Sequence, residues 1–161
     1  MRRIVLGFAI AASCAIPTLL VAQGKPAAPA KAASAPLPAA VQKIDLVTVS
    51  GIDYAFAVPP VINAGTVTFD LVNNGEDVHA MTLLQLPDNH TMRDFLDTFH
   101  HNGLIPPWMT TLGSTPTIAP KQEAFITARL KPGRYVLACL IPARDGRAHT
   151  EKGMVQSFTV K

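Results

Sequence analysis

From residue 43 onward, hydrophobic positions fall into short runs rich in β-branched and aromatic residues. In one run, Val67, Phe69 and Leu71 alternate with polar residues, and this two-residue period is typical of a half-buried strand. Glycine, proline and asparagine clusters separate the runs and predict turns. Seven strands are predicted, at 44–49, 54–58, 66–72, 79–86, 124–130, 135–140 and 155–160. Their number and spacing predict an all-β fold, a β-sandwich.

One segment has the period of a helix instead. Met92, Phe95 and Phe99 recur at positions i, i+3 and i+7, with Thr91 or Asn89 available as the N-cap. Gly103 is predicted to end this helix, and 104–120 is predicted to be a long ordered loop. The sandwich therefore has one short helix inserted between its strands.

The first 42 residues differ in composition from the rest. Two arginines precede an apolar run at 4–22 that contains Pro17, which predicts a signal peptide at 1–22 with cleavage after Ala22. A lipoprotein signal with lipidation at Cys14 is an alternative. Alanine and proline supply 12 of the 20 residues at 23–42, which predicts a tether. We expect a periplasmic or secreted protein with no membrane span in the mature chain.

The remaining segment, 43–161, has the length of one domain. Four of the 14 basic residues precede position 43, whereas all 11 acidic residues follow it, so the domain is nearly neutral. Nucleic-acid binding needs a basic patch on the domain itself, so this function is not expected. We expect a monomer.

Removal of a signal peptide would leave Cys139 without an internal partner for a disulfide. An unpaired thiol in an oxidising compartment needs a reason, although many free cysteines are simply buried hydrophobic residues. His149 and Met154 follow Cys139 closely, and His79 lies about sixty residues upstream. Thiolate, two imidazoles and a thioether form a ligand set that selects copper.

The strand period places Tyr135, Leu137 and Cys139 on one face of their strand, with Cys139 at its end. His79 is predicted to begin a neighbouring strand, and His149 is expected near the surface. The ligands would then lie at one end of the sandwich, where loops cluster.

In order and spacing, residues 45–161 resemble the cupredoxins, the blue copper proteins. The features that carry the resemblance are Asn74-Gly75 before His79, Pro132-Gly133 and Tyr135 before Cys139, and Gly153-Met154 before the last strand. The resemblance implies a Greek-key sandwich and one copper ion. It also implies His79, Cys139 and His149 as equatorial ligands, Met154 as the axial ligand, and one-electron transfer to or from a redox partner protein.

Two features differ from small electron carriers of that family. Nine residues separate Cys139 from His149, where two to four are common, although the copper domains of nitrite reductases have a loop of similar length. Ala80 follows the first histidine, where asparagine often helps to fasten the cysteine strand. Two alternatives therefore stay open: a periplasmic protein that receives copper(I) from a donor and passes it on, and a metal-free interaction module.

Enzyme catalysis has little support in the sequence. There is no Ser-His-Asp order, no phosphate-binding glycine loop and no His-x-His pair of the multicopper oxidases. His100 and His101 are adjacent and do not share a helix face, so we expect them to be exposed rather than ligands. Met81 and Met109 are expected to pack in the core or in loops.

Overall fold

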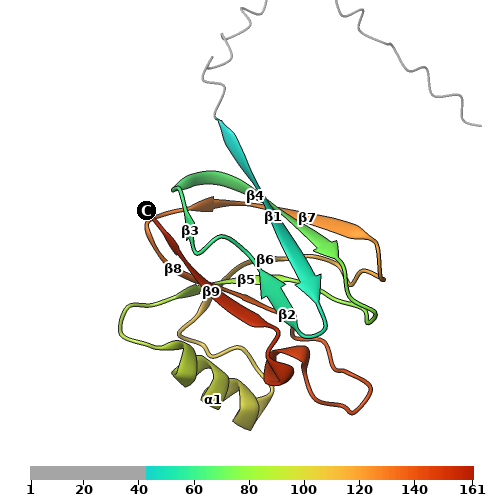
Figure 1. The fold of residues 1–161 in the computed structure, drawn as a ribbon. Coiled ribbons are helices and arrows are strands. Elements are labelled where there is room, and N and C mark those ends of the chain that lie inside the picture. The colour runs from blue at the N-terminus through green and yellow to red at the C-terminus, as the bar shows by residue number, and fades with distance from the viewer. Residues whose placement is uncertain (1–42) are drawn as a thin grey trace, which may run out of the picture. The chain divides into compact units, whose positions relative to one another are not determined.

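Two β-sheets packed face to face make up the described part of the chain, residues 43–161, in a computed structural model (Figure 1). The predicted signal peptide, the tether and Cys14 lie outside the described residues. The first sheet has the order β2-β1-β4-β7, formed by β1 (Ile44–Ile52), β2 (Ala55–Ala57), β4 (Gly65–Asn73) and β7 (Glu123–Leu130). The second has the order β3-β9-β8-β5-β6, formed by β3 (Val61–Ile62), β5 (Thr82–Leu86), β6 (Thr110–Ser114), β8 (Gly133–Ala138) and β9 (Val155–Val160). The predicted all-β sandwich is confirmed.

Strand β4 shows how alternation in the sequence becomes a buried face. It pairs parallel with β1 and antiparallel with β7. Val67, Phe69 and Leu71 are fully buried between the sheets. Thr68 points outward, and its hydroxyl lies 2.8 Å from that of Thr127 on β7. The predicted two-residue period therefore separates core from surface as expected.

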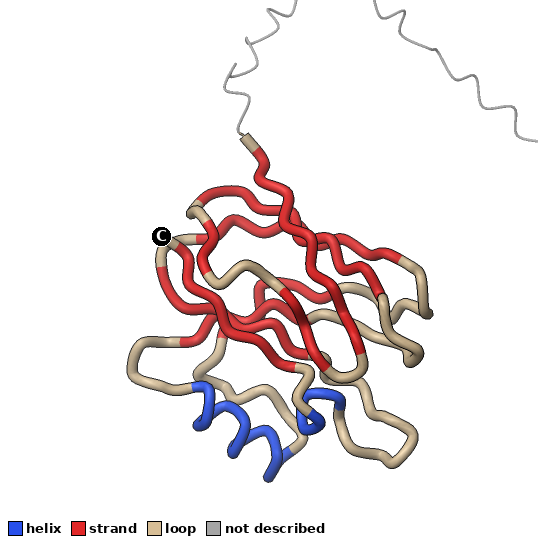
Figure 2. The backbone as a smooth tube through the Cα atoms, viewed as in Figure 1, coloured by secondary structure: helices blue, strands red, loops and turns tan. Residues whose placement is uncertain are grey.

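Strand β8 is buried on both faces. Tyr135, Leu137 and Cys139, which lies one residue beyond the strand, belong to the core between the two sheets. Val136 and Ala138 face the opposite way, into a second apolar cluster beneath helix α1 (Met92–Asn102). Figure 2 shows this helix lying outside the sheet that contains β8.

Helix α1 has the limits that the sequence predicts. Thr91 is the N-cap, and its side chain accepts a hydrogen bond from the Asp94 N–H while the Asp94 carboxylate reaches back, which completes a capping box. Gly103 ends the helix with φ of 65°. Phe95 and Phe99 are the buried residues of the helix, so its apolar stripe is what attaches it to the sheet.

Three elements differ from the sequence-based prediction. The strand predicted at 79–86 begins only at Thr82, β6 lies within the predicted loop at 104–120, and the two-residue strand β3 was not predicted. Strand β6 contains Thr, Leu, Gly and Ser and has little hydrophobic alternation. It forms because the edge of β5 offers backbone hydrogen bonds, with a register shift between Leu83 and Leu84.

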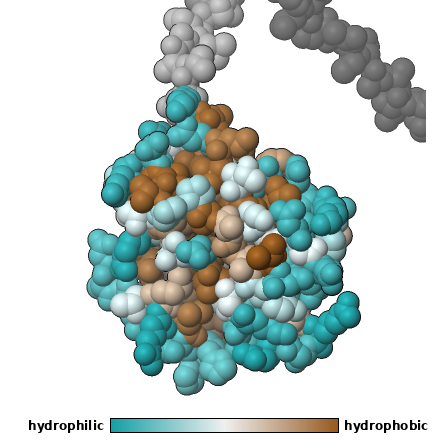
Figure 3. Space-filling model, viewed as in Figure 1, coloured by the Kyte–Doolittle hydropathy of each residue, from teal (hydrophilic) through white to brown (hydrophobic). Residues whose placement is uncertain are grey.

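The outer surface mixes hydrophobic and hydrophilic side chains, as Figure 3 shows for the face that carries β1. Ile44 and Leu46 on β1 are 58% and 65% exposed. Within residues 43–161, no helix combines the length and the apolar character needed to cross a bilayer.

Candidate metal centre

The loop between β8 and β9 carries three of the four predicted ligands and is closed by its own backbone. Cys139 N–H donates to the Met154 carbonyl at 3.0 Å, and Met154 N–H donates to the His149 carbonyl at 2.9 Å. His149 begins a short 3-10 turn, η1 (His149–Lys152), and its N–H donates to the Ile141 carbonyl at 2.9 Å. These bonds bring residues ten and fifteen positions after Cys139 back to its side.

His79 comes from a separate segment that precedes β5. It forms an isolated bridge with Ile118, with N–H to carbonyl distances of 3.0 and 2.8 Å in the two directions. The buried Asn73 amide donates to the Ile118 carbonyl at 3.2 Å and to the Asp77 carbonyl at 2.9 Å. The backbone on both sides of His79 is thus fixed although it is not part of a strand.

Two imidazoles and one thiol converge at this end of the sandwich. His79 Nδ1 lies 3.2 Å from His149 Nδ1, which lies 3.5 Å from Cys139 Sγ. All three residues are fully buried, and their potential ligand atoms lie within 4.8 Å of one another. Nitrogen and sulfur donors bind a first-row metal ion at roughly 2.0–2.3 Å, so donors that share an ion can lie up to about 4 Å apart. The two separations that involve His149 satisfy this limit, and the donor set fits copper.

Met154 lies beside this cluster, where Gly51 leaves space for both its side chain and His79. A Cβ atom at Gly51 would lie 3.3 Å from Met154 Cε and 3.7 Å from His79 Cδ2. Met154 is fully buried. The structure therefore brings all four predicted residues together, and their role as ligands remains a prediction.

The Cys139 thiol is held among backbone N–H groups. Ala80 N–H approaches Sγ at 3.4 Å. Burial raises the pKa of the Cys139 thiol, and the N–H groups of Ala80 and Ile141 offset this only in part. Thr150 donates both its hydroxyl and its N–H to the Cys139 carbonyl, each at 2.8 Å. Thr150 thus fastens the cysteine segment, a task that sequence reasoning associated with an asparagine at position 80.

The ring of His149, which was expected near the surface, has no exposed area of its own. The ring of Tyr54 covers it edge-on, with ring centroids 4.6 Å apart. Burial, and then the nearby His79, lower the pKa of His149, which favours the neutral ring that a metal ligand requires. The sequence could not reveal this cover, because Tyr54 lies 95 positions before His149.

Comparison with known proteins identifies the architecture. No protein-family model matches the sequence, and no curated protein matches it. Among solved structures, auracyanin B is similar with a TM-score of 0.52 and 23% identity, over 76% of this chain and 91% of that chain. Auracyanin A, described as a "blue" copper protein from the green thermophilic photosynthetic bacterium Chloroflexus aurantiacus, has a TM-score of 0.51 and 16% identity, over 74% of this chain and all of that chain. The chain has the cupredoxin fold.

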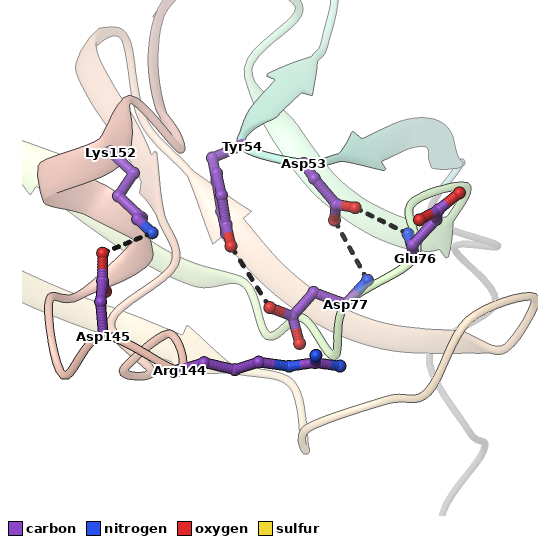
Figure 4. Close-up of a pocket in the computed structure, with 7 residues that line it drawn as sticks. All are labelled: Asp53, Tyr54, Glu76, Asp77, Arg144, Asp145 and Lys152. Carbon is purple, nitrogen blue, oxygen red and sulfur yellow. Dashed lines mark hydrogen bonds and ion pairs between the residues drawn. The ribbon is translucent and has the colours of Figure 1, made fainter.

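A hollow of about 330 Å³ opens at this end of the cupredoxin sandwich, and Figure 4 shows the residues that line it. Two of them, Asp53 and Tyr54, contact the histidines of the cluster. Its lining is charged and consists of Asp53, Tyr54, Glu76, Asp77, Arg144, Asp145 and Lys152. The Tyr54 hydroxyl donates to Asp77 Oδ2 at 3.3 Å, and Lys152 forms an ion pair with Asp145 at 2.8 Å. Tyr54 therefore separates the buried His149 from the hollow.

Asp53 is a contact of the cluster that sequence reasoning missed. Its Oδ1 lies 2.7 Å from His79 Nε2. Burial alone would raise the pKa of Asp53, but hydrogen bonds from the Glu76 and Asp77 N–H groups and from His79 outweigh this effect and lower it. Asp53 lies in the turn between β1 and β2, 26 positions before His79, so no local spacing connects the two residues.

The exposed histidines His100 and His101 lie outside the cluster. His100 is exposed and pairs with Glu151 at 2.7 Å, and the ring of His101 contacts the Asp97 carbonyl of its own helix. Met81 and Met109 are buried, as the sequence predicts.

Proposed function

We propose that this chain is a copper protein that transfers single electrons through one mononuclear site of the blue-copper type. The observation that carries the proposal is the convergence of two imidazole nitrogens and one thiol sulfur in a fully buried cluster. His79, Cys139 and His149 would hold the ion, and Met154 would be the weak axial ligand. Copper would supply the redox couple.

The residues around the site would hold the donor atoms in position and exclude water from them. The backbone hydrogen bonds within the loop between β8 and β9 hold Cys139, His149 and Met154, and the bridge to Ile118 holds His79. Because these contacts do not depend on the oxidation state of an ion, the donors would move little when an electron arrives or leaves. A dry, closely packed surrounding also resists such movement.

The burial of the three donor residues favours a copper ion that stays bound over one that is passed on to another protein. Passing copper(I) to another protein requires ligands of that protein to reach the ion. His79, Cys139 and His149 have no exposed surface, so direct exchange would require the loop to open. Four protein ligands would also leave no open position of the kind that catalytic metal sites keep. These arguments favour electron transfer over copper handling and over catalysis.

The proposal also covers the cellular setting. The signal peptide predicted at 1–22 would export the chain to the periplasm or the medium, and 23–42 would be a tether. The domain would act as a monomer and exchange electrons with a partner protein.

Copper titration of the purified chain tests the proposal. One equivalent of Cu(II) should produce the intense visible absorption of a copper–thiolate bond, and Cys139→Ala should lose both the colour and tight binding. His101→Ala, which removes an exposed histidine whose ring contacts the Asp97 carbonyl of its own helix, should keep both. No colour and no tight binding in the parent would refute a copper function. Tight Cu(I) binding without a stable blue form would instead support copper handling.

A further inference from the structure

The two buried histidines are held differently on the side that faces away from Cys139. His79 Nε2 lies 2.7 Å from Asp53 Oδ1, which is hydrogen-bonding distance. His149 Nε2 is buried and has no hydrogen-bond partner among residues 43–161, and the nearest carboxylate oxygen, Asp77 Oδ2, lies 3.8 Å away. One ring is anchored by a carboxylate and the other is not.

The Asp53 carboxylate is itself fixed in place. Its Oδ2 accepts a hydrogen bond from Glu76 N–H at 2.8 Å, and its Oδ1 accepts one from Asp77 N–H at 3.3 Å, as Figure 4 shows. The loop fits closely around this contact at Gly75, where a Cβ atom would lie only 2.8 Å from His79 Nε2 and would also collide with the carboxylate. Asp53 in the turn between β1 and β2, the loop at residues 75–77 and the ring of His79 are therefore packed directly against one another.

We propose that Asp53 is a positioning residue that fixes His79 as the Nε2–H tautomer and keeps its Nδ1 bare and directed at the metal position. An ionised carboxylate only accepts hydrogen bonds, so the ring nitrogen that faces it carries the hydrogen. A neutral imidazole then has its lone pair on the other nitrogen. This inference rests on the proposed copper site, and it assigns to Asp53 the task of preparing one ligand in advance.

His149 is then the ligand that adjusts. Its Nδ1 lies 3.2 Å from the bare Nδ1 of His79, so in the metal-free protein it donates its own hydrogen across this contact. That arrangement leaves Nε2 of His149 bare, which agrees with its lack of a partner. To bind a metal, His149 must carry its hydrogen on Nε2 instead, on the side that faces Asp77. The exchange moves one hydrogen from Nδ1 to Nε2 and changes no net charge.

Ring-nitrogen NMR of the full metal-free chain labelled with ¹⁵N tests the tautomers directly. We expect Nε2–H for His79 and Nδ1–H for His149. Addition of Cu(I), which is diamagnetic, should leave His79 unchanged and convert His149 to Nε2–H. A parent protein in which His79 carries its hydrogen on Nδ1 would overturn the proposal without any variant being made.

A pair of variants separates Asp53 from the general charge of the hollow. Asp53→Ala should give mixed tautomers at His79 and weaken Cu(II) binding by about 10- to 100-fold, the usual effect of losing such a partner. Asp77→Asn alters a carboxylate in the same hollow that makes no hydrogen bond to an imidazole, and it should leave the His79 tautomer unchanged. A single Nε2–H tautomer and parental affinity in Asp53→Ala would refute the role of Asp53.

The two proposals can fail separately. If the parent binds no copper, the proposed function is wrong, whereas the His79 tautomer in the metal-free chain still decides whether Asp53 positions the ring. If Asp53→Ala does not fold, the His79 tautomer in the spectrum of the parent protein still decides whether Asp53 positions the ring.

Discussion

Asp70 carries a negative charge on the outer face of β4, where burial raises its pKa and the nearby Glu123 raises it further. Its Oδ1 is buried and has no hydrogen-bond partner among residues 43–161. An acid with a raised pKa in the folded state binds its proton more tightly there than in the unfolded chain. Its ionised form therefore destabilises the fold, fully so above the folded pKa and not at all below the unfolded value of 3.8.

Replacement of Asp70 by asparagine should therefore stabilise the protein at neutral pH. We expect Asp70→Asn to raise the free energy of unfolding by roughly 0.2–1 kcal/mol at neutral pH, the range for like charges on adjacent strands. The gain should shrink as the pH falls toward 3.8, because the parent then loses the same charge. Urea unfolding at several pH values measures both effects. A gain that does not change with pH would show that charge is not the cause.

Gly75 provides a second test at a single residue. Gly75→Ala should push the loop away from the Asp53–His79 contact, because its Cβ would lie 2.8 Å from His79 Nε2. We expect a loss of about 1–3 kcal/mol in the free energy of unfolding, typical of overpacking, together with weaker copper binding. Gly113→Ala is the matched control, because nothing lies within 4 Å of a Cβ atom there. Equal behaviour of the two variants in thermal unfolding would contradict this explanation.

For single residues, the sequence predicts the features of the structure that depend on neighbouring positions along the chain. Strand alternation correctly directs Cys139 toward the core, because only the period of its own strand is involved. The burial of His149 and the contact of Asp53 with His79 could not be predicted. Both depend on the turn between β1 and β2. The position of this turn relative to His79 and to the loop between β8 and β9 is set by the packing of the sheets, not by the sequence of the turn itself.

Helix α1 allows a test at the scale of an element. Thr91→Ala removes the side-chain oxygen that accepts from Asp94 N–H, and we expect the free energy of unfolding to fall by about 0.5–2 kcal/mol. Thr91→Ser keeps the oxygen and should remain close to the parent in the same urea titration. The loss should be global, because Phe95 and Phe99 cover the outer face of β8. A parental value for Thr91→Ala would mean that the cap contributes nothing.

A helix or strand can be predicted from the sequence when the residues that determine it lie within or next to that element. Thr91 and Gly103 mark the ends of α1 in the sequence, and the structure agrees. Strand β6 has no such signal, because its partner β5 supplies the reason for its extended backbone. The 3-10 turn at His149–Lys152 also depends on contacts outside itself, including the ion pair between Glu151 and His100 of α1.

The predicted domain boundary at residue 43 can be tested directly by shortening the chain. Residues 43–161 contain both sheets, the helix and the candidate metal centre. A chain that begins at Lys43 should therefore fold and unfold at the same temperature as the chain that begins at Gln23, and should bind copper equally well. Calorimetry and copper titration of the two chains make the comparison. A lower unfolding temperature for the shorter chain would place part of the fold before residue 43.

Copper should stabilise the whole domain, because its proposed ligands come from two distant segments, the one before β5 and the loop between β8 and β9. Unfolding separates these segments, so an ion that binds only the native state raises the free energy of unfolding by about 2.7 kcal/mol at a free concentration 100 times the Kd. For a domain of this size, that gain corresponds to a rise of roughly 10 °C in Tm. The rise should depend on copper concentration and disappear in Cys139→Ala, whereas His101→Ala should retain it. A chelator should reverse it in the parent. An equal rise in Cys139→Ala would mean that copper binds outside the buried cluster.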